Sequence, residues 1–268
     1  MLNEILSTIR SEKPLVHCIT NYVTANDCAN ILLACGASPI MADDPDEAAE
    51  ITSQCSGLVL NLGTPNQRKL QAMKLAGREA NRLSLPIILD PVGVGCSSIR
   101  RDAVRLMMNE LLFSVIRGNS AEIAALIHET HASRGVDAEP TNESDAVKNA
   151  RLLAQATGAT VIVTGESDIV TDGKKTFRVL NGHPMMRSVT GAGCQLSALL
   201  GAFAAANPNR IPEAALAAVC TMGLCGETAH HRLSPLEGNA TYRSYIIDAV
   251  FNLTSTELEK GARYEIIR

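Results

Sequence analysis

Short apolar segments alternate with longer segments of helical periodicity through the first 165 residues. The apolar segments end at or next to Gly, Asn or Asp and span residues 14–20, 37–42, 57–63, 86–92, 113–119 and 159–165. Continuous apolar runs of this length are typical of strands buried on both faces of a parallel sheet. The helical segments span residues 24–35, 45–54, 66–83, 98–110, 120–127 and 144–157. This alternation predicts an α/β fold with right-handed crossovers.

The pattern changes after residue 165. Residues 169–171 and 176–180 are strand-like and flank Asp172-Gly173, which predicts an antiparallel hairpin. From Gly191 onward the chain is predicted to be mostly helical. Residues 135–144 are the most polar stretch and are expected to form a mobile loop. Because no linker, repeat or low-complexity tract is visible, we expect one domain over residues 1–268.

Composition excludes several classes of protein. The net charge is −4 and the Lys and Arg residues are scattered, so no basic surface for nucleic acid is expected. Trp is absent and aromatic residues make up 3%, which leaves few platforms for base stacking or membrane interfaces. The apolar run 196–206 is too short to span a bilayer. Residues 2–9 have the spacing of an amphipathic helix, and we expect no secretion signal there. We therefore expect neither a nucleic-acid nor a membrane partner.

The chain has eight cysteines, none of them in a C-x-x-C pair, and most lie in apolar surroundings. Buried free thiols in a reducing cytoplasm are expected, without a disulfide framework. His128 and His131 are three residues apart, but no further ligand pair stands near them, so no zinc site is expected.

A glycine-rich segment, Gly191-Ala192-Gly193-Cys194, leads into an apolar run at helical spacing. Free backbone N–H groups at a helix N-terminus bind anions such as phosphate, and glycine lets a ligand approach the main chain. Cys194 is predicted to lie in the first helical turn, where a thiol is acidified and can take part in chemistry. The alternative is a loosened helix start with a buried cysteine.

Polar residues end the predicted strands, and in an open parallel sheet ligands bind at the carboxyl ends of strands. The residues are Asn21, Asn61, Asp90, Arg117, Asn119 and Thr164, followed by Glu122 in the next helix. A turn role for Asp90 and a helix N-terminal role for Glu122 are structural alternatives. An acid, a base and several amides at strand ends are nevertheless more than a core needs, which favours a functional site.

Several of these segments together resemble the hydroxyethylthiazole kinase family of the ribokinase-like superfamily, over residues 14–229. The resemblance is carried by residues 14–21, 36–42, 89–93, 116–123, 163–166 and 189–194. Within these blocks, Gly-Ala-Ser-Pro at 36–39 and the cysteine after the glycines are the most specific.

The resemblance implies a single-domain ribokinase-like fold, with a mostly parallel central sheet flanked by helices on both faces. The implied reaction transfers the ATP γ-phosphoryl group to the hydroxyl of 4-methyl-5-(2-hydroxyethyl)thiazole, in thiamine biosynthesis and salvage. The alternatives are another ribokinase-like small-molecule kinase, of the hydroxymethylpyrimidine or pyridoxal type, and a catalytically quiet thiazole- or nucleotide-binding regulator. The resemblance also implies a homotrimer with the thiazole site between subunits.

Roles for individual residues follow from the resemblance by matching motif. The residues expected to contact the thiazole are Asn21, Met41 and Gly191, and those expected to bind ATP are Arg117 and Thr164. Asp90 and Glu122 are expected to organise Mg²⁺ through water. The anion hole for the transferring phosphoryl group is assigned to Gly191, Ala192 and Gly193. Cys194 occupies the position of the superfamily's general-base aspartate, which leaves the identity of the base open.

Overall fold

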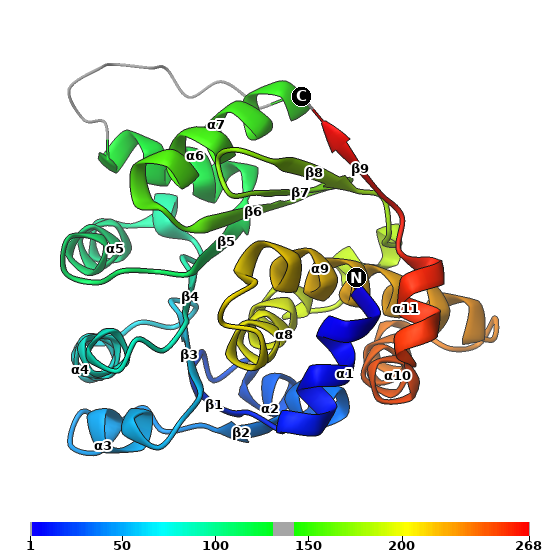
Figure 1. Cartoon of the computed structure of the whole chain (residues 1–268), viewed down its shortest axis with the longest axis horizontal. Coiled ribbons are helices and arrows are strands. Elements are labelled where there is room, and N and C mark those ends of the chain that lie inside the picture. The colour runs from blue at the N-terminus through cyan, green and yellow to red at the C-terminus, as the bar shows by residue number, and fades with distance from the viewer. Residues whose placement is uncertain (1, 131–141, 268) are drawn as a thin grey trace.

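Nine strands form one sheet in this computed structural model, which describes residues 2–130 and 142–267 (Figure 1). The strand order is β2-β1-β3-β4-β5-β6-β7-β8-β9. The parallel part consists of β1 (Leu15–Ile19), β2 (Ser38–Ile40), β3 (Gly57–Asn61), β4 (Ile87–Asp90), β5 (Val115–Asn119) and β6 (Thr160–Thr164). The antiparallel part adds β7 (Asp168–Thr171), β8 (Thr176–Val179) and β9 (Tyr264–Ile267).

The mostly parallel α/β sheet confirms the fold class predicted from the alternating pattern. The predicted hairpin is formed by β7 and β8, which pair antiparallel. One strand differs from its expectation: β2 has only three residues and is partly exposed, whereas residues 37–42 were expected to be buried. The reason is its place at the edge of the sheet, where β1 is its only neighbour in the strand order.

Helices cover both faces of the sheet, as expected (Figure 1). One layer contains α3 (Ala48–Ser53), α4 (Gln67–Arg82), α5 (Ser98–Glu110), α6 (Ser120–Thr130) and α7 (Glu143–Thr157). The other contains α1 (Leu2–Glu12), α2 (Ala25–Cys35), α8 (Ala192–Ala206), α9 (Ile211–Arg232), α10 (Asn239–Asn252) and α11 (Ser255–Gly261). Two short 3₁₀ helices are η1 (Val94–Cys96) and η2 (Pro184–Ser188). Each layer packs its own apolar core against the strands.

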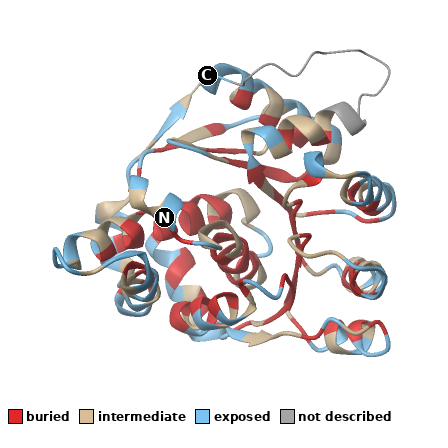
Figure 2. Cartoon of the chain, turned by 180° about the vertical axis from the view of Figure 1, so that it is seen from behind, coloured by how far each residue is buried: buried red, intermediate tan, exposed pale blue. Residues whose placement is uncertain are grey.

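Helix α8 lies at the centre of the second layer and is buried along most of its length. It packs against α9 and against strands β1, β3 and β4. Figure 2 shows buried residues concentrated in the central strands and in the helices that pack on them. Because α8 is held on all sides, its N-terminus has a fixed position above the carboxyl ends of these strands.

One sequence expectation is confirmed and another needs correction. The chain after Gly191 is mostly helical, as predicted, although β9 closes the antiparallel edge beside β8. The four residues of β9 include Glu265, so the strand has no continuous apolar pattern and depends on pairing with β8. Helix α3 is shorter than the expected 45–54, because residues 45–47 form turns.

Other expectations at the termini and loops have mixed outcomes. Helix α1 buries Leu2, Ile5, Leu6 and Ile9, which confirms the amphipathic pattern. His131 and residues 135–141 of the expected loop lie outside the described residues. None of the described helices combines the length and hydropathy needed to cross a membrane.

Candidate functional site

The register of the parallel strands brings the polar strand ends side by side. Asn61 at the end of β3 pairs with Asp90 at the end of β4. Asn119 at the end of β5 pairs with Thr164 at the end of β6. The sequence prediction that these side chains share one edge of the sheet is therefore confirmed for both pairs.

The glycine-rich segment forms the start of α8 above this edge. Gly191 is the N-cap residue and has φ +86°, a left-handed conformation that favours glycine. A β-carbon at Gly191 would also collide with the Thr24 side chain. The first N–H groups of a helix have no carbonyl one turn earlier in the helix, and in α8 the Ala192 N–H makes only a long bond of 3.4 Å to the Val189 carbonyl. The first turn of α8 therefore presents donors and a positive dipole end.

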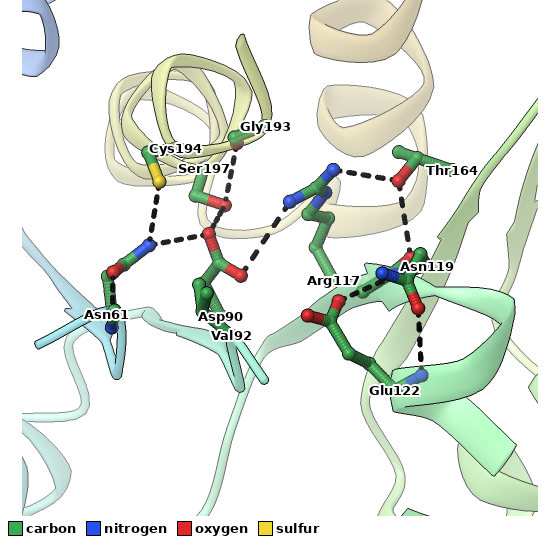
Figure 3. A network of polar contacts seen from close by, with 12 residues as sticks. Asn61, Asp90, Val92, Arg117, Asn119, Glu122, Thr164, Gly193, Cys194 and Ser197 are labelled. Atoms are coloured by element: carbon green, nitrogen blue, oxygen red, sulfur yellow. Dashed lines mark hydrogen bonds and ion pairs between the residues drawn. The ribbon is translucent and has the colours of Figure 1, made fainter. Parts of the chain in front are cut away.

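Asp90 is the centre of a buried polar network (Figure 3). Its side chain is fully buried. Asn61 Nδ2 and Ser197 Oγ each donate to Asp90 Oδ2 at 2.7 Å. Oδ1 accepts no hydrogen bond from a described residue and lies 3.6 Å from Arg117 Nη1. Burial raises the pKa of Asp90 to about 6, although Arg117 and the two donors oppose this rise.

Arg117 extends from β5 between Asp90 and Thr164 (Figure 3). Its Nη2 donates to Thr164 Oγ1 at 2.7 Å. The guanidinium also packs against Gly193 in the first turn of α8, where an added β-carbon would lie 2.5 Å from Nη1. The absence of a side chain at Gly193 therefore lets a cation lie directly against a helix N-terminus, an arrangement suited to a polyphosphate.

Glu122 has a different environment from Asp90. Its Oε1 accepts from the Gly93 backbone N–H at 2.8 Å and its Oε2 from the Asn119 N–H at 2.9 Å. The Asn119 side chain in turn accepts from the Glu122 N–H at 2.9 Å. Glu122 thus ties the loop after β4 to the start of α6.

Cys194 lies in the first turn of α8, as predicted, but its thiol is not acidified. Burial raises the pKa of Cys194, and the neighbouring Asp90 carboxylate raises it further. Nδ2 of Asn21 and Nδ2 of Asn61 each lie 3.3 Å from Sγ and donate to it. Of the two sequence interpretations, the structure favours the buried cysteine over the activated thiol, because desolvation and a nearby negative charge both raise the pKa of Cys194.

A cleft of about 570 Å³ opens beside the first turn of α8. Of the residues assigned from the sequence, those that line it are Arg117, Thr164, Gly191, Ala192 and Gly193. Asn21 and Cys194 lie in the adjacent polar network. Met41 does not line this cleft; it directly follows β2 and packs on the apolar core that includes α8.

Asp168 and Ser197 belong to this region but were not singled out from the sequence. Asp168 lines the cleft and accepts from the Gly165 N–H at 3.0 Å. Burial raises its pKa to about 6. Ser197 lies four residues after Gly193, and its Oγ lies 3.2 Å from the Gly193 carbonyl oxygen. The spacing of one helical turn from Gly193 could have identified Ser197 as a residue of the site. Asp168 gives no such signal in the sequence, because it is one polar residue at the start of a strand.

Metal-ligand clusters of the usual kind are absent from the described residues: no group of three or more His, Cys, Asp and Glu side chains could hold an ion. All eight cysteines carry free thiols, and most are buried, as expected. Any cation at this site would therefore rely on one or two carboxylates together with groups of a bound ligand.

Comparison with known proteins agrees with the geometry. Residues 6–256 match the hydroxyethylthiazole kinase family. Hydroxyethylthiazole kinase of Clostridium acetobutylicum is 50% identical over 271 residues, which cover 99% of each protein. The structure of a hydroxyethylthiazole kinase protein from Pyrococcus horikoshii superposes with a TM-score of 0.90 at 33% identity, covering 100% of this chain and 99% of that one.

A more distant structure shows how widely the fold is shared. A ribokinase-like superfamily protein from Enterococcus faecalis has a TM-score of 0.66 at 14% identity, covering 97% of this chain and 95% of that one. At this identity the likeness supports the ribokinase-like fold alone. The full-length match and the relatives of high identity go further, and the chain belongs to the hydroxyethylthiazole kinase family.

Proposed function

We propose that this protein is an ATP-dependent kinase that phosphorylates the hydroxyl of 4-methyl-5-(2-hydroxyethyl)thiazole, in thiamine biosynthesis and salvage. The observation that carries this proposal is the stack of Asp90, Arg117 and the α8 N-terminus at one edge of the sheet. Phosphoryl transfer needs alignment and electrostatic stabilisation more than covalent help, and this stack provides donors and a cation for a charged phosphoryl group.

The cleft beside α8 is the proposed nucleotide site. Arg117 and Thr164 line it and would bind the ATP phosphates, since a guanidinium can grip phosphate oxygens bidentately. The backbone N–H groups at Gly191, Ala192 and Gly193 would form the anion hole for the transferring group. The volume of about 570 Å³ is within the range of ligand pockets.

The acceptor alcohol is proposed to bind on the other side of the α8 start, against Asn21, Met41 and Gly191. Asn21 is buried and holds Cys194 and Asn61 in place, which limits this side of the site. Met41 is partly buried and offers a polarizable thioether to a sulfur-containing aromatic ring.

Mg²⁺ is the proposed metal. The buried Asp90 Oδ1, which has no hydrogen-bond partner among the described residues, fits a cation or its water, and Glu122 in the first turn of α6 is bonded to the Gly93 N–H of the loop after β4. Both carboxylates would act through water, as Mg²⁺ keeps much of its hydration shell. The metal would neutralise charge on the ATP phosphates.

Cys194 is proposed to contribute little as a base, because its thiol is protonated at neutral pH. With a loose transition state the alcohol need not lose its proton early. Cys194→Ala should therefore lower kcat by less than about tenfold, below the usual loss when a general base is removed. Cys194→Asp should remain active, because Asn21 and Asn61 already donate to this position. Turnover lost with Ala and kept with Asp would instead identify residue 194 as the base.

We further propose a cytoplasmic homotrimer with the thiazole site between subunits. Tyr22 and Val23 follow the buried Asn21 and are 79% and 58% exposed. Large apolar side chains beside a binding site suit an interface with another copy of the chain. Sedimentation should give the mass of three chains, and a fully active monomer would contradict the trimer. The free thiols suit a reducing compartment.

The function is tested by ADP release, coupled to a colour reaction, with a panel of thiazole, pyrimidine and pyridine alcohols. Turnover should be greatest with the hydroxyethylthiazole. Turnover of hydroxymethylpyrimidine or pyridoxal without the thiazole would support another kinase of the superfamily. Binding of the thiazole without ADP release from any alcohol would support a regulator instead.

A further inference from the structure

Two buried polar side chains lie beneath the proposed acceptor site and have no part in the mechanism above. His17 on β1 is fully buried, and Lys69 on α4 is 4% exposed. Among the described residues Lys69 is the only lysine that is buried. Burying an ammonium group is costly unless it is paired and hydrogen-bonded, so its partners indicate what the burial achieves.

Lys69 joins two loops. Its Nζ donates to the Thr20 carbonyl at 2.9 Å and lies 3.3 Å from Asp43 Oδ2. Thr20 directly precedes Asn21, and Asp43 is two residues after Met41. One ammonium group therefore connects the loops that carry both side chains assigned to the thiazole.

His17 holds the second loop from below. Its Nε2 lies 2.7 Å from the Ala42 carbonyl, which can only accept, so Nε2 carries the hydrogen and donates. Burial lowers the pKa of His17, which favours the neutral ring. Nδ1 is then an acceptor, and it lies 2.8 Å from the Thr52 hydroxyl on α3. Through His17, the backbone next to Met41 is anchored to β1 and α3.

The need for such anchoring follows from the sheet. Strand β2 is a three-residue edge strand whose pairing with β1 ends at Ile40. Ladder hydrogen bonds therefore stop just before Met41. Side-chain bonds from His17 and Lys69 hold the following residues instead.

We propose that Lys69 and His17 are positioning residues that hold the Met41 and Asn21 loops in place for the acceptor alcohol. The proposal rests on the proposed function for its substrate. The nucleotide cleft should depend less on this clamp of Lys69 and His17, because its lining comes from β5, residues 164–168, residues 181–191 and helices α8 and α9, of which Gly191 packs against Thr24 of the Asn21 loop.

The first test is Lys69→Met, with Lys74→Met as the control. Met keeps the length of the stem, and the freed Asp43 side chain is 56% exposed and can be solvated. Lys74 is on the same helix but pairs at the surface with Glu110 at 3.3 Å. In Lys69→Met we expect KM for the thiazole alcohol to rise about tenfold or more, with KM for ATP within about twofold of wild type. Lys74→Met should change neither constant.

The second test compares His17→Gln with His17→Leu. Gln can still donate to the Ala42 carbonyl, whereas Leu cannot. KM for the thiazole should rise in His17→Leu and be partly restored in His17→Gln. A merely structural role would instead lower thermal stability and change both KM values together.

Hydrogen–deuterium exchange separates this proposal from the proposed function, because it needs no turnover. In Lys69→Met, peptides covering residues 20–24 and 41–46 should exchange faster, while peptides covering 160–168 should be unchanged. Unchanged exchange at 20–24 and 41–46 would overturn the clamp. Faster exchange with an unaltered thiazole KM would overturn its positioning role. A wild-type enzyme without thiazole turnover would refute the proposed function. The exchange measurement would still show whether Lys69 holds the two loops in place.

Discussion

Asp90 and Glu122 are two carboxylates at the same edge of the sheet, but their surroundings differ. Asp90 is fully buried, takes its hydrogen bonds from two side chains and keeps one oxygen without a hydrogen-bond partner among the described residues. Glu122 is half-buried and uses both oxygens to accept backbone N–H groups from two loops. The Asp90 carboxylate is therefore buried with one oxygen that accepts no hydrogen bond among the described residues. The Glu122 carboxylate, in contrast, holds two backbone segments in place.

The difference teaches that equal sequence assignments do not imply equal chemistry. A buried carboxylate with a raised pKa, whose Oδ1 has no hydrogen bond among the described residues and faces Arg117 at 3.6 Å, is suited to meet a cation that arrives with substrate. A carboxylate whose lone pairs already accept N–H groups is suited first to fix loop geometry, and only then to contact hydrated metal. The variants below should separate these two roles.

Asp90→Asn should have the largest effect. Loss of the buried charge removes electrostatic stabilisation at the phosphoryl site, and we expect kcat to fall by about a hundredfold to a thousandfold. Asp102→Asn is the matched control, because Asp102 is an exposed carboxylate paired with Arg105 on α5. Steady-state kinetics of both variants checks this, and a wild-type kcat in Asp90→Asn would refute the role of Asp90.

Gly193→Ala should come next. The added methyl group would lie 2.5 Å from Arg117 Nη1 and push the guanidinium away from the helix N-terminus. A displacement of about 1 Å in a catalytic group can cost about a hundredfold in rate, so we expect a fall in kcat/KM for ATP of about tenfold to a hundredfold. Gly95→Ala is the control, since a β-carbon there meets no atom within 4 Å. Equal kinetics for the two alanine variants would be incompatible with this packing.

Glu122→Gln should have a smaller effect than Asp90→Asn. Gln retains one acceptor oxygen but turns an NH₂ group toward one of the two backbone donors. We expect kcat to fall by no more than about tenfold, with a loss of about 1 kcal/mol in the free energy of unfolding. Glu79→Gln, which removes only a surface pair with Arg82, serves as control. A kcat loss as large as that of Asp90→Asn would make the two carboxylates equivalent.

The stability of Asp90→Asn relative to wild type should depend on pH. Folding raises the pKa of Asp90 from its ordinary 3.8 to about 6, so the folded state binds the proton more tightly. This stabilisation is complete below about pH 4 and is lost as pH rises through about 6. As the pH rises from 4 to 8, the free energy of unfolding of the variant should therefore increase by roughly 1–3 kcal/mol relative to that of wild type. Urea unfolding of both proteins, with a chelator present, measures this difference. Asp168 also has a raised pKa, but its titration contributes equally to both proteins and does not affect the difference. A pH-independent difference would contradict the raised pKa.

The sequence predicted the parallel part of the fold well, because strands β1, β3, β4, β5 and β6 are continuous apolar segments. It also placed Asp90, Asn119 and Thr164 at one edge, since parallel strands align their ends. Three features depended on tertiary contacts and could not be read from the pattern. Strand β9 requires β8 as a partner. The raised pKa of Cys194 follows from burial and from Asp90, which is distant in sequence. Lys69 looks like any other helix lysine until its partners are known.

The most direct test of the central claim follows the label of γ-labelled ATP in the presence of the hydroxyethylthiazole. We expect wild type and Asp102→Asn to transfer the label to the thiazole alcohol at similar rates, and Asp90→Asn to transfer it about a hundredfold more slowly or worse. Label found only in inorganic phosphate, or only on a pyrimidine or pyridine alcohol supplied in competition, would contradict a thiazole kinase built around Asp90.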